Sequence, residues 1–243
     1  MLEIKFFIDK IGDKMTLKNI DLFPHNTSVN ALGNLTIDNI DINDLADEFG
    51  TPLYVYDETT IRSIAKEYKS QFQNLYPKTK VAYASKAFMS LSMAKIAKEE
   101  GLSLDVVSGG EVAIAAKSGF PTSEMYFHGN NKTPQELSEA IDSGVGTIVV
   151  DGFHELRLLN EIAKNKNTTQ EIMLRLSPSV DAHTHGHTTT GILDVKFGFS
   201  IETGESSQAI DESLNSSNLD LKGIHFHLGS PIFELEPYST AID

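Results

Sequence analysis

From about residue 50 onward, the chain alternates short apolar runs with longer stretches in which apolar residues recur every three or four positions. Short apolar runs closed by glycine or polar residues predict buried strands, and the longer period predicts amphipathic helices. We expect six strands, at residues 81–85, 102–107, 125–127, 147–150, 172–176 and 223–228. We expect helices at residues 58–75, 90–100, 110–118, 134–144, 153–164 and 205–214.

This alternation of strand and helix predicts an α/β fold, a parallel sheet with helices outside it. Repeated strand–helix units of this length are typical of a TIM-like (β/α)8 barrel, which needs eight strands and roughly 250 residues. Because the first of these strands begins near residue 80, we expect about six of the eight strands in this chain. Residues 48–243 would then form a partial barrel, and the chain would be the N-terminal portion of a longer protein.

Residues 1–47 follow a different pattern and form a lead-in to the barrel. Residues 2–7 and 35–37 are predicted strands, and residues 45–49 are a predicted short helix that Gly50 ends. We expect this lead-in to pack on a second, β-rich domain that lies mostly outside this chain.

Charge and composition narrow the function. The net charge is −14 and there is no basic run, which argues against binding to a nucleic acid backbone. No apolar stretch is long enough to span a bilayer, the N-terminus lacks the features of a signal peptide, and there is no cysteine for a disulfide or a thiolate metal site. We therefore expect a soluble, cytoplasmic protein that acts on a small molecule and not on nucleic acid or a membrane.

Polar residues stand where successive predicted strands end. Active sites of parallel barrels lie at the carboxyl ends of the strands and are assembled from several of them. The pattern therefore predicts one site at this edge of the sheet, made from Lys86, Asp105, Glu111, His128, Asp151, Arg175, His225 and His227.

Lys86 is the strongest candidate for covalent chemistry. It follows an apolar strand directly and precedes a helix, so we expect its amine to be partly buried. Burial lowers the pKa of a lysine and makes the free amine a nucleophile that forms a Schiff base with an aldehyde. The alternative is a lysine whose stem packs on the strand while its ammonium reaches water.

Arg175 lies inside an apolar strand, where a guanidinium needs a buried partner.

Several of these residues also have simpler explanations. In the simpler explanation, Asp105 pairs with a lysine or caps the next helix. Ser108 and Glu111 would likewise form an ordinary helix cap. His225 and His227 share one face of a strand, which also suits a metal ion. A further histidine cluster lies on a polar loop and is suited to adventitious metal binding; it consists of His183, His185 and His187. The pair Gly229–Ser230 offers a backbone amide and a hydroxyl, which suit a phosphate.

An ordered set of motifs resembles the fold type III, alanine-racemase-like family of pyridoxal-phosphate enzymes, and within it the diaminopimelate decarboxylase branch. The similarity runs from about residue 22 to the last residue. The motifs are GTPLYVYD at 50–57, YASKAF at 83–88, LDVVSGGE at 104–111, HGNNK at 128–132, AHTH at 182–185, KFG at 196–198 and HFHLGS at 225–230.

The resemblance implies a cofactor, a reaction and a role for each site residue. The cofactor would be pyridoxal 5'-phosphate, and the reaction would be decarboxylation of meso-2,6-diaminopimelate to L-lysine and CO2, with no metal. Lys86 would form the Schiff base, His227 would stack on the ring and Ser230 would contact the phosphate. The remaining cofactor-binding residues, which would form a polar network near the lysine and the ring, are Asp105, Glu111 and Arg175.

The resemblance also implies parts beyond Asp243. These are a glycine-rich phosphate loop, a Glu-Pro-Gly-Arg segment, and a β-domain with a tyrosine and a cysteine that acts across a homodimer. We therefore expect the 243 residues alone to be inactive, because an open barrel leaves unpaired strand edges.

Three alternatives stay open at this point. Ornithine, arginine and carboxynorspermidine decarboxylases and alanine racemase share the lysine strand, although racemases usually continue differently after the lysine. A metal-dependent barrel hydrolase would use His225 and His227 as ligands. A non-catalytic homologue would keep the fold as a binding module.

Overall fold

The computed structural model describes residues 8–11, 14–17, 20–178, 180, 197–229 and 232–243. The chain divides into two compact units, Met1–Lys80 and Val81–Asp243, and each is described by itself. The expected strand at residues 2–7 and the AHTH motif lie outside the described residues. The expected boundary between lead-in and barrel at residue 47 stays a prediction.

The first unit contains short antiparallel strands followed by two helices. β1 (Ile8–Ile11) pairs with β2 (Lys14–Leu17), and β4 (Leu35–Ile37) lies between β3 (Thr27–Val29) and β5 (Ile40–Asp41). A short 3-10 turn, η2, spans Ile20–Leu22, and the helices are α1 (Ile42–Phe49) and α2 (Glu58–Leu75). α1 begins three residues before the expected start because the Asp41 carboxylate accepts a hydrogen bond from the Asn43 amide and caps the helix there.

The second unit is built on a parallel sheet, as the alternation of the sequence predicts. Its strands are β6 (Ala82–Ala84), β7 (Ser103–Val106), β8 (Met125–Phe127), β9 (Thr147–Val150), β10 (Gln170–Ser177), β11 (Phe199–Ser200) and β12 (Leu219–His225). β6 to β10 lie side by side in chain order, and both β11 and β12 pair with β10. The six expected strands are all present, and β11 is a seventh that the pattern did not predict.

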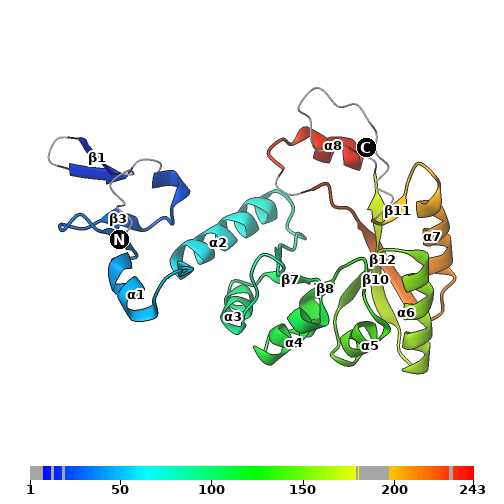
Figure 1. Ribbon diagram of the computed structural model, residues 1–243. Coiled ribbons are helices and arrows are strands. Elements are labelled where there is room, and N and C mark those ends of the chain that lie inside the picture. The colour runs from blue at the N-terminus through cyan, green and yellow to red at the C-terminus, as the bar shows by residue number, and fades with distance from the viewer. Residues whose placement is uncertain (1–7, 12–13, 18–19, 179, 181–196, 230–231) are drawn as a thin grey trace. The chain divides into compact units, whose positions relative to one another are not determined.

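Helices cross between consecutive strands and follow one another along the outside of the sheet (Figure 1). They are α3 (Leu91–Glu99), α4 (Gly109–Lys117), α5 (Pro134–Asp142), α6 (Phe153–Asn165) and α7 (Glu205–Leu214), with a short turn η3 (Thr122–Glu124) and a last helix α8 (Glu236–Ile242). α5 begins with a capping box, in which the side chains of Thr133 and Glu136 each accept a hydrogen bond from the other's backbone amide.

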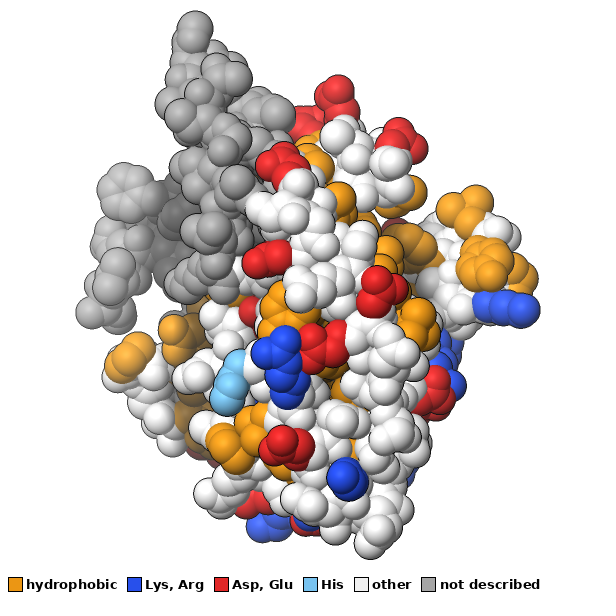
Figure 2. Space-filling view, turned by 90° about the vertical axis from the view of Figure 1, so that its right-hand side faces the viewer, with side chains coloured by type: hydrophobic (Ala, Val, Ile, Leu, Met, Phe, Trp, Pro, Cys, Tyr) orange, Lys and Arg blue, Asp and Glu red, His pale blue; other side chains and the backbone are white. Residues whose placement is uncertain are grey.

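The core lies between this sheet and its helices. All four residues of β9 are buried, as in a parallel strand covered on both faces. On the outer surface, Arg157 of α6 pairs with Glu212 of α7 at 2.7 Å. Figure 2 shows acidic and basic side chains dispersed among uncharged surface on one face of the molecule.

Together these features match a partial TIM-like barrel whose strand carboxyl ends share one edge. No helix among the described residues is long and apolar enough to cross a membrane.

Candidate active site

The strand register brings the predicted polar residues to one edge of the sheet. Ala84 of β6 pairs with Asp105 of β7, and Arg175 of β10 pairs with His225 of β12. His128 directly follows β8, and its amide donates to the Val106 carbonyl of β7. The register therefore brings residues from the carboxyl ends of five parallel strands to the same edge of the sheet.

Lys86 lies in the turn after β6 and is exposed, so the expectation of a partly buried amine was wrong. The reason is its position: in the described structure β6 is the edge strand, with β7 as its neighbour on one side only. The charge of Lys86 still reaches the site, because it opposes the burial that raises the pKa of Asp105. The neighbouring Ser85 is buried, and its hydroxyl has no hydrogen-bond partner among the described residues.

Asp105, His128 and His225 form the centre of the edge. The Asp105 Oδ1 atom lies 3.9 Å from His128 Nδ1, and the two imidazole rings have centroids 4.6 Å apart. Burial raises the pKa of Asp105 to about 6. Burial lowers the pKa of His128 to about 3 and that of His225 to about 4, and the nearby Arg175 charge acts in the same direction on both.

These shifts keep both imidazoles neutral at pH 7, so each ring has one N–H donor and one acceptor nitrogen. His128 Nε2 and His225 Nδ1 are buried and have no hydrogen-bond partner within the described part of the chain. Buried polar atoms of native proteins nearly always have a partner, so these atoms suit a polar ligand.

Arg175 has the buried partner that its place in an apolar strand requires. Its Nη1 donates to Asp151 Oδ1 at 3.1 Å, and both side chains are less than a tenth exposed. The other Asp151 oxygen accepts a hydrogen bond from the Gly198 amide at 3.2 Å, and the guanidinium lies 4.4 Å from the Phe197 ring centroid. Asp151 thus fixes the guanidinium and the segment that enters β11.

A second buried ion pair was missed by the sequence argument. Lys132 Nζ lies 2.8 Å from Glu155 Oε1 and also donates to the carbonyls of Gly129 and Val149. Lys132 belongs to the HGNNK motif, but only the folded chain brings it to Glu155 of α6. The sequence signal that could have indicated this pair is Glu155, which lies four residues after Asp151 in α6, a helix that begins at the carboxyl end of β9.

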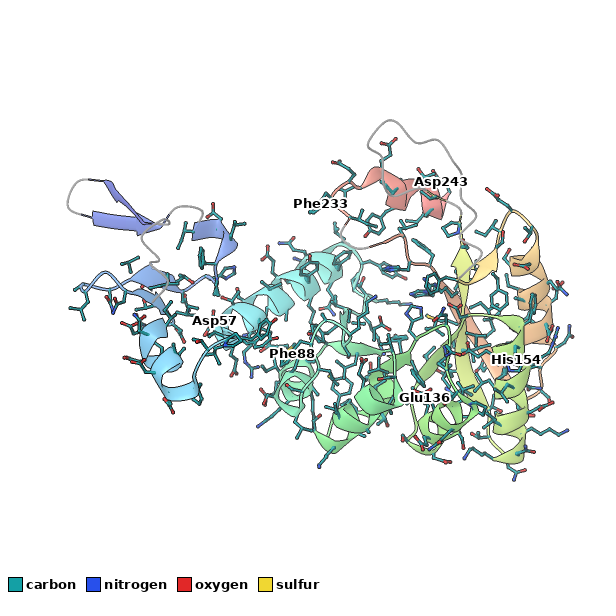
Figure 3. The ribbon with its side chains drawn as sticks, viewed as in Figure 1. Asp57, Phe88, Glu136, His154, Phe233 and Asp243 are labelled. Atoms are coloured by element: carbon teal, nitrogen blue, oxygen red, sulfur yellow. The ribbon has the colours of Figure 1, made fainter. Side chains whose placement is uncertain are left out.

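The turn from β7 into α4 is held by carboxylates. Ser108 caps α4 by accepting the Glu111 amide, which confirms the simpler reading of that serine. Glu111 accepts from the Val107 amide at 2.9 Å, one residue before the cap. Glu136, at the start of α5 (Figure 3), accepts from the Gly109 amide at 3.0 Å and so joins two successive loops.

His227 follows β12 and keeps part of its surface exposed, while the desolvation of its remaining surface and the charge of Lys86 lower its pKa. Ser230 and the loop histidines at 183, 185 and 187 lie outside the described residues. Within the described ranges, no group of three or more His, Cys, Asp or Glu side chains is arranged to hold a metal ion. The metal alternative therefore has no third ligand beside His225 and His227 in that part of the chain.

The edge suits a polar, anionic small molecule. Lys86, Lys132 and Arg175 all act on the carboxylate of Asp105, and because Lys132 and Arg175 each have a buried carboxylate partner, Lys86 is the cation among these three that is left for an anionic group. Beside them are neutral imidazoles and the Ser85 hydroxyl, which has no hydrogen-bond partner among the residues that the structure describes. Cations together with neutral donors at the ends of barrel strands are a suitable environment for a phosphate or carboxylate group.

Comparison with known proteins agrees with this chemistry. The family described as pyridoxal-dependent decarboxylase, pyridoxal binding domain, matches residues 60–243. The chain is 48% identical to the diaminopimelate decarboxylase of Bacillus methanolicus, over 90% of this chain and 51% of the relative. It is 46% identical to that of Bacillus subtilis strain 168, over 91% of this chain and 51% of the relative.

A solved structure is similar as well. Diaminopimelate decarboxylase from M. jannaschii in co-complex with L-lysine superposes with a TM-score of 0.79 at 33% identity, covering 88% of this chain and 50% of that one. The chain spans about half the length of each of these relatives.

Proposed function

The chain belongs to the pyridoxal-binding-domain family of pyridoxal-dependent decarboxylases, and from this we propose that the protein decarboxylates meso-2,6-diaminopimelate to L-lysine and CO2. The observation that carries the proposal is the edge where Lys86, Asp105, His128, Arg175 and His225 meet within the matched region. Relatives named diaminopimelate decarboxylase, and one solved with L-lysine, support this substrate over other amino acids.

The residues at this edge fit pyridoxal phosphate. Lys86 is exposed at the end of its strand, where its amine is accessible to an aldehyde. Buried atoms on Ser85, His128 and His225 without partners among the described residues offer hydrogen bonds to a polar ring. When bound, pyridoxal phosphate supplies an electron sink for the charge left when CO2 departs.

We assign the following roles to the residues of this chain. Lys86 holds the cofactor through its amine, His227 covers the ring, and Ser230 contacts the phosphate. Asp105, Glu111 and Arg175 are the polar groups near the ring and the lysine. Arg175 contributes a positive charge that favours an anionic ligand, while burial holds His128 and His225 neutral so that they orient the ligand without adding charge.

The substrate is an amino acid in this proposal, and the working protein is a homodimer in the cytoplasm. The homodimer and the location follow from the family resemblance and stay predictions. The dimer is tested by measuring the molar mass in solution by light scattering, at protein concentrations from about 1 μM to about 100 μM in tenfold steps.

The function is tested by assaying the protein, as encoded by its natural gene, with pyridoxal phosphate and a panel of amino acids. We expect CO2 and lysine from meso-diaminopimelate, and none from ornithine or arginine at comparable rates. Lys86→Ala should abolish turnover, whereas Lys95→Ala, an exposed lysine of the next helix, should keep it. Faster turnover of ornithine or arginine would transfer the assignment to those decarboxylases.

A further inference from the structure

Four charged residues form one buried chain of contacts at the site, in the order Lys132, Glu155, Asp151 and Arg175. Lys132 Nζ pairs with Glu155 Oε1 at 2.8 Å, and Glu155 Oε2 accepts from the Asp151 amide at 3.1 Å. Asp151 Oδ1 in turn accepts from Arg175 at 3.1 Å. Each of the four residues is less than a tenth exposed, and their formal charges cancel.

The ammonium of Lys132 is held on all sides. Nζ donates hydrogen bonds to the carbonyls of Gly129 and Val149, the second at 2.8 Å, and it lies 2.8 Å from Glu155 Oε1 as an ion pair. This arrangement ties the loop after β8 to β9 and to α6. The lysine therefore does more than neutralise one carboxylate, since it fixes where Glu155 sits.

The far end of this chain of contacts is the cofactor-facing edge. Asp151 holds Arg175 with one oxygen and the Gly198 amide with the other. Gly198 has φ +71°, and a Cβ there would lie 2.7 Å from the Arg175 carbonyl, so this backbone packs directly against Arg175. The charge of Arg175 acts on Asp105, His128, His225 and His227.

We infer that Lys132 is a positioning residue for the cofactor site, which it serves by holding Glu155 and, through the Asp151 backbone, the guanidinium of Arg175. Lys132 touches neither cofactor nor substrate in this account. The inference rests on the proposed function, because it requires that Arg175 face pyridoxal phosphate.

The test uses the protein encoded by its natural gene, titrated with pyridoxal phosphate and followed by absorbance and fluorescence. Lys132→Met removes the ammonium and keeps an unbranched side chain that is one atom shorter. Lys132→Met/Glu155→Met removes both charges and leaves no unpaired one, so it restores folding if the single variant is unstable. Lys166→Met is the matched control, because Lys166 pairs with Asp142 on the surface.

We expect the dissociation constant of pyridoxal phosphate to rise roughly tenfold or more in Lys132→Met, and to stay raised in the double variant. The pH midpoint of cofactor binding should also move upward, because the charges of Lys132 and Arg175 both depress the pKa of Asp105 and His225, and the variant removes the first and loosens the second. Lys166→Met should match the wild type in both measurements.

Two results would overturn the inference while the wild type still binds the cofactor. One is a folded Lys132→Met protein whose dissociation constant lies within about twofold of the wild type. The other is full recovery of binding in the double variant, which would show that Lys132 only balances charge. Absence of cofactor binding by the wild type would instead refute the proposed function, and the inference with it.

Discussion

Replacing Asp151 with asparagine should destabilise the protein far more than the same change at Asp142. Asp151 pairs with Arg175 at 3.1 Å where both side chains are less than a tenth exposed, and Asp142 pairs with Lys166 at 2.6 Å with its own side chain 63% exposed. Asp151 also accepts a hydrogen bond with each of its two oxygens, from Arg175 and from Gly198. Asparagine has only one oxygen, so its NH2 group would face a donor.

The magnitude follows from the burial. At 3.1 Å and an effective dielectric constant of about 20, two unit charges attract by about 5 kcal/mol, part of which desolvation of the aspartate offsets. Removing one partner of a buried pair typically costs about 3 to 5 kcal/mol, and an exposed pair contributes about 0 to 1 kcal/mol. We therefore expect Asp151→Asn to lower the free energy of unfolding by about 3 kcal/mol or more, and Asp142→Asn by less than about 1 kcal/mol.

Urea unfolding of both variants measures this difference. With a slope near 3 kcal/mol per M, the midpoint of Asp151→Asn should fall by about 1 M or more. Equal losses of unfolding free energy in the two variants would refute the reasoning, because they would mean that burial of the Asp151–Arg175 pair adds nothing to its contribution to stability.

Three further substitutions and one control test the packing and electrostatics of the same unit by urea unfolding. Gly198→Ala should cost about 2 kcal/mol or more, because the backbone there is left-handed and the new methyl meets the Arg175 carbonyl; a loss under about 0.5 kcal/mol would contradict this close approach. Phe127→Ala should cost about 3 to 5 kcal/mol because Phe127 is fully buried, whereas Phe233→Ala, at an exposed position of the same unit, should cost under about 1 kcal/mol; similar losses would show that the barrel core is placed wrongly. Burial lowers the pKa of His128 to about 3, so between about pH 6.5 and 3 the unfolded chain binds a proton on this residue that the folded chain does not. The free energy of unfolding therefore falls as the pH drops through that window. His128→Asn should reduce this fall, and an unchanged pH dependence would argue against a buried neutral imidazole.

Much of the fold could be predicted because strand and helix alternate with clear periods. The strand β9 and the helices α2 and α7 have the expected bounds to the residue. β11 was not predicted, because its two residues are too few to show a period and form a strand only by pairing with the last residues of β10. β12 begins at Leu219, four residues before its expected start, because pairing with β10 extends it along the sheet.

The site could be predicted in outline and not in its contacts. Parallel strands bring their carboxyl ends to one edge, so the list of strand-end residues was enough to place Asp105, His128 and Arg175 together. Which carboxylate pairs with Arg175 depends on side-chain geometry between strands, and periodicity carries no signal for it. The exposure of Lys86 was missed because the apolar strand before it suggested burial, although the expected open barrel already implied that this first strand lies at an edge.

The central claim, that Lys86 carries pyridoxal phosphate, is tested most directly by borohydride trapping. The protein encoded by its natural gene is loaded with the cofactor, reduced, digested with trypsin and mapped by mass spectrometry. We predict a pyridoxyl adduct on Lys86, in a peptide running from Val81 to Lys95 because trypsin does not cleave after the modified lysine. A folded, cofactor-supplied protein with no adduct, or with the adduct on another lysine, would contradict the account.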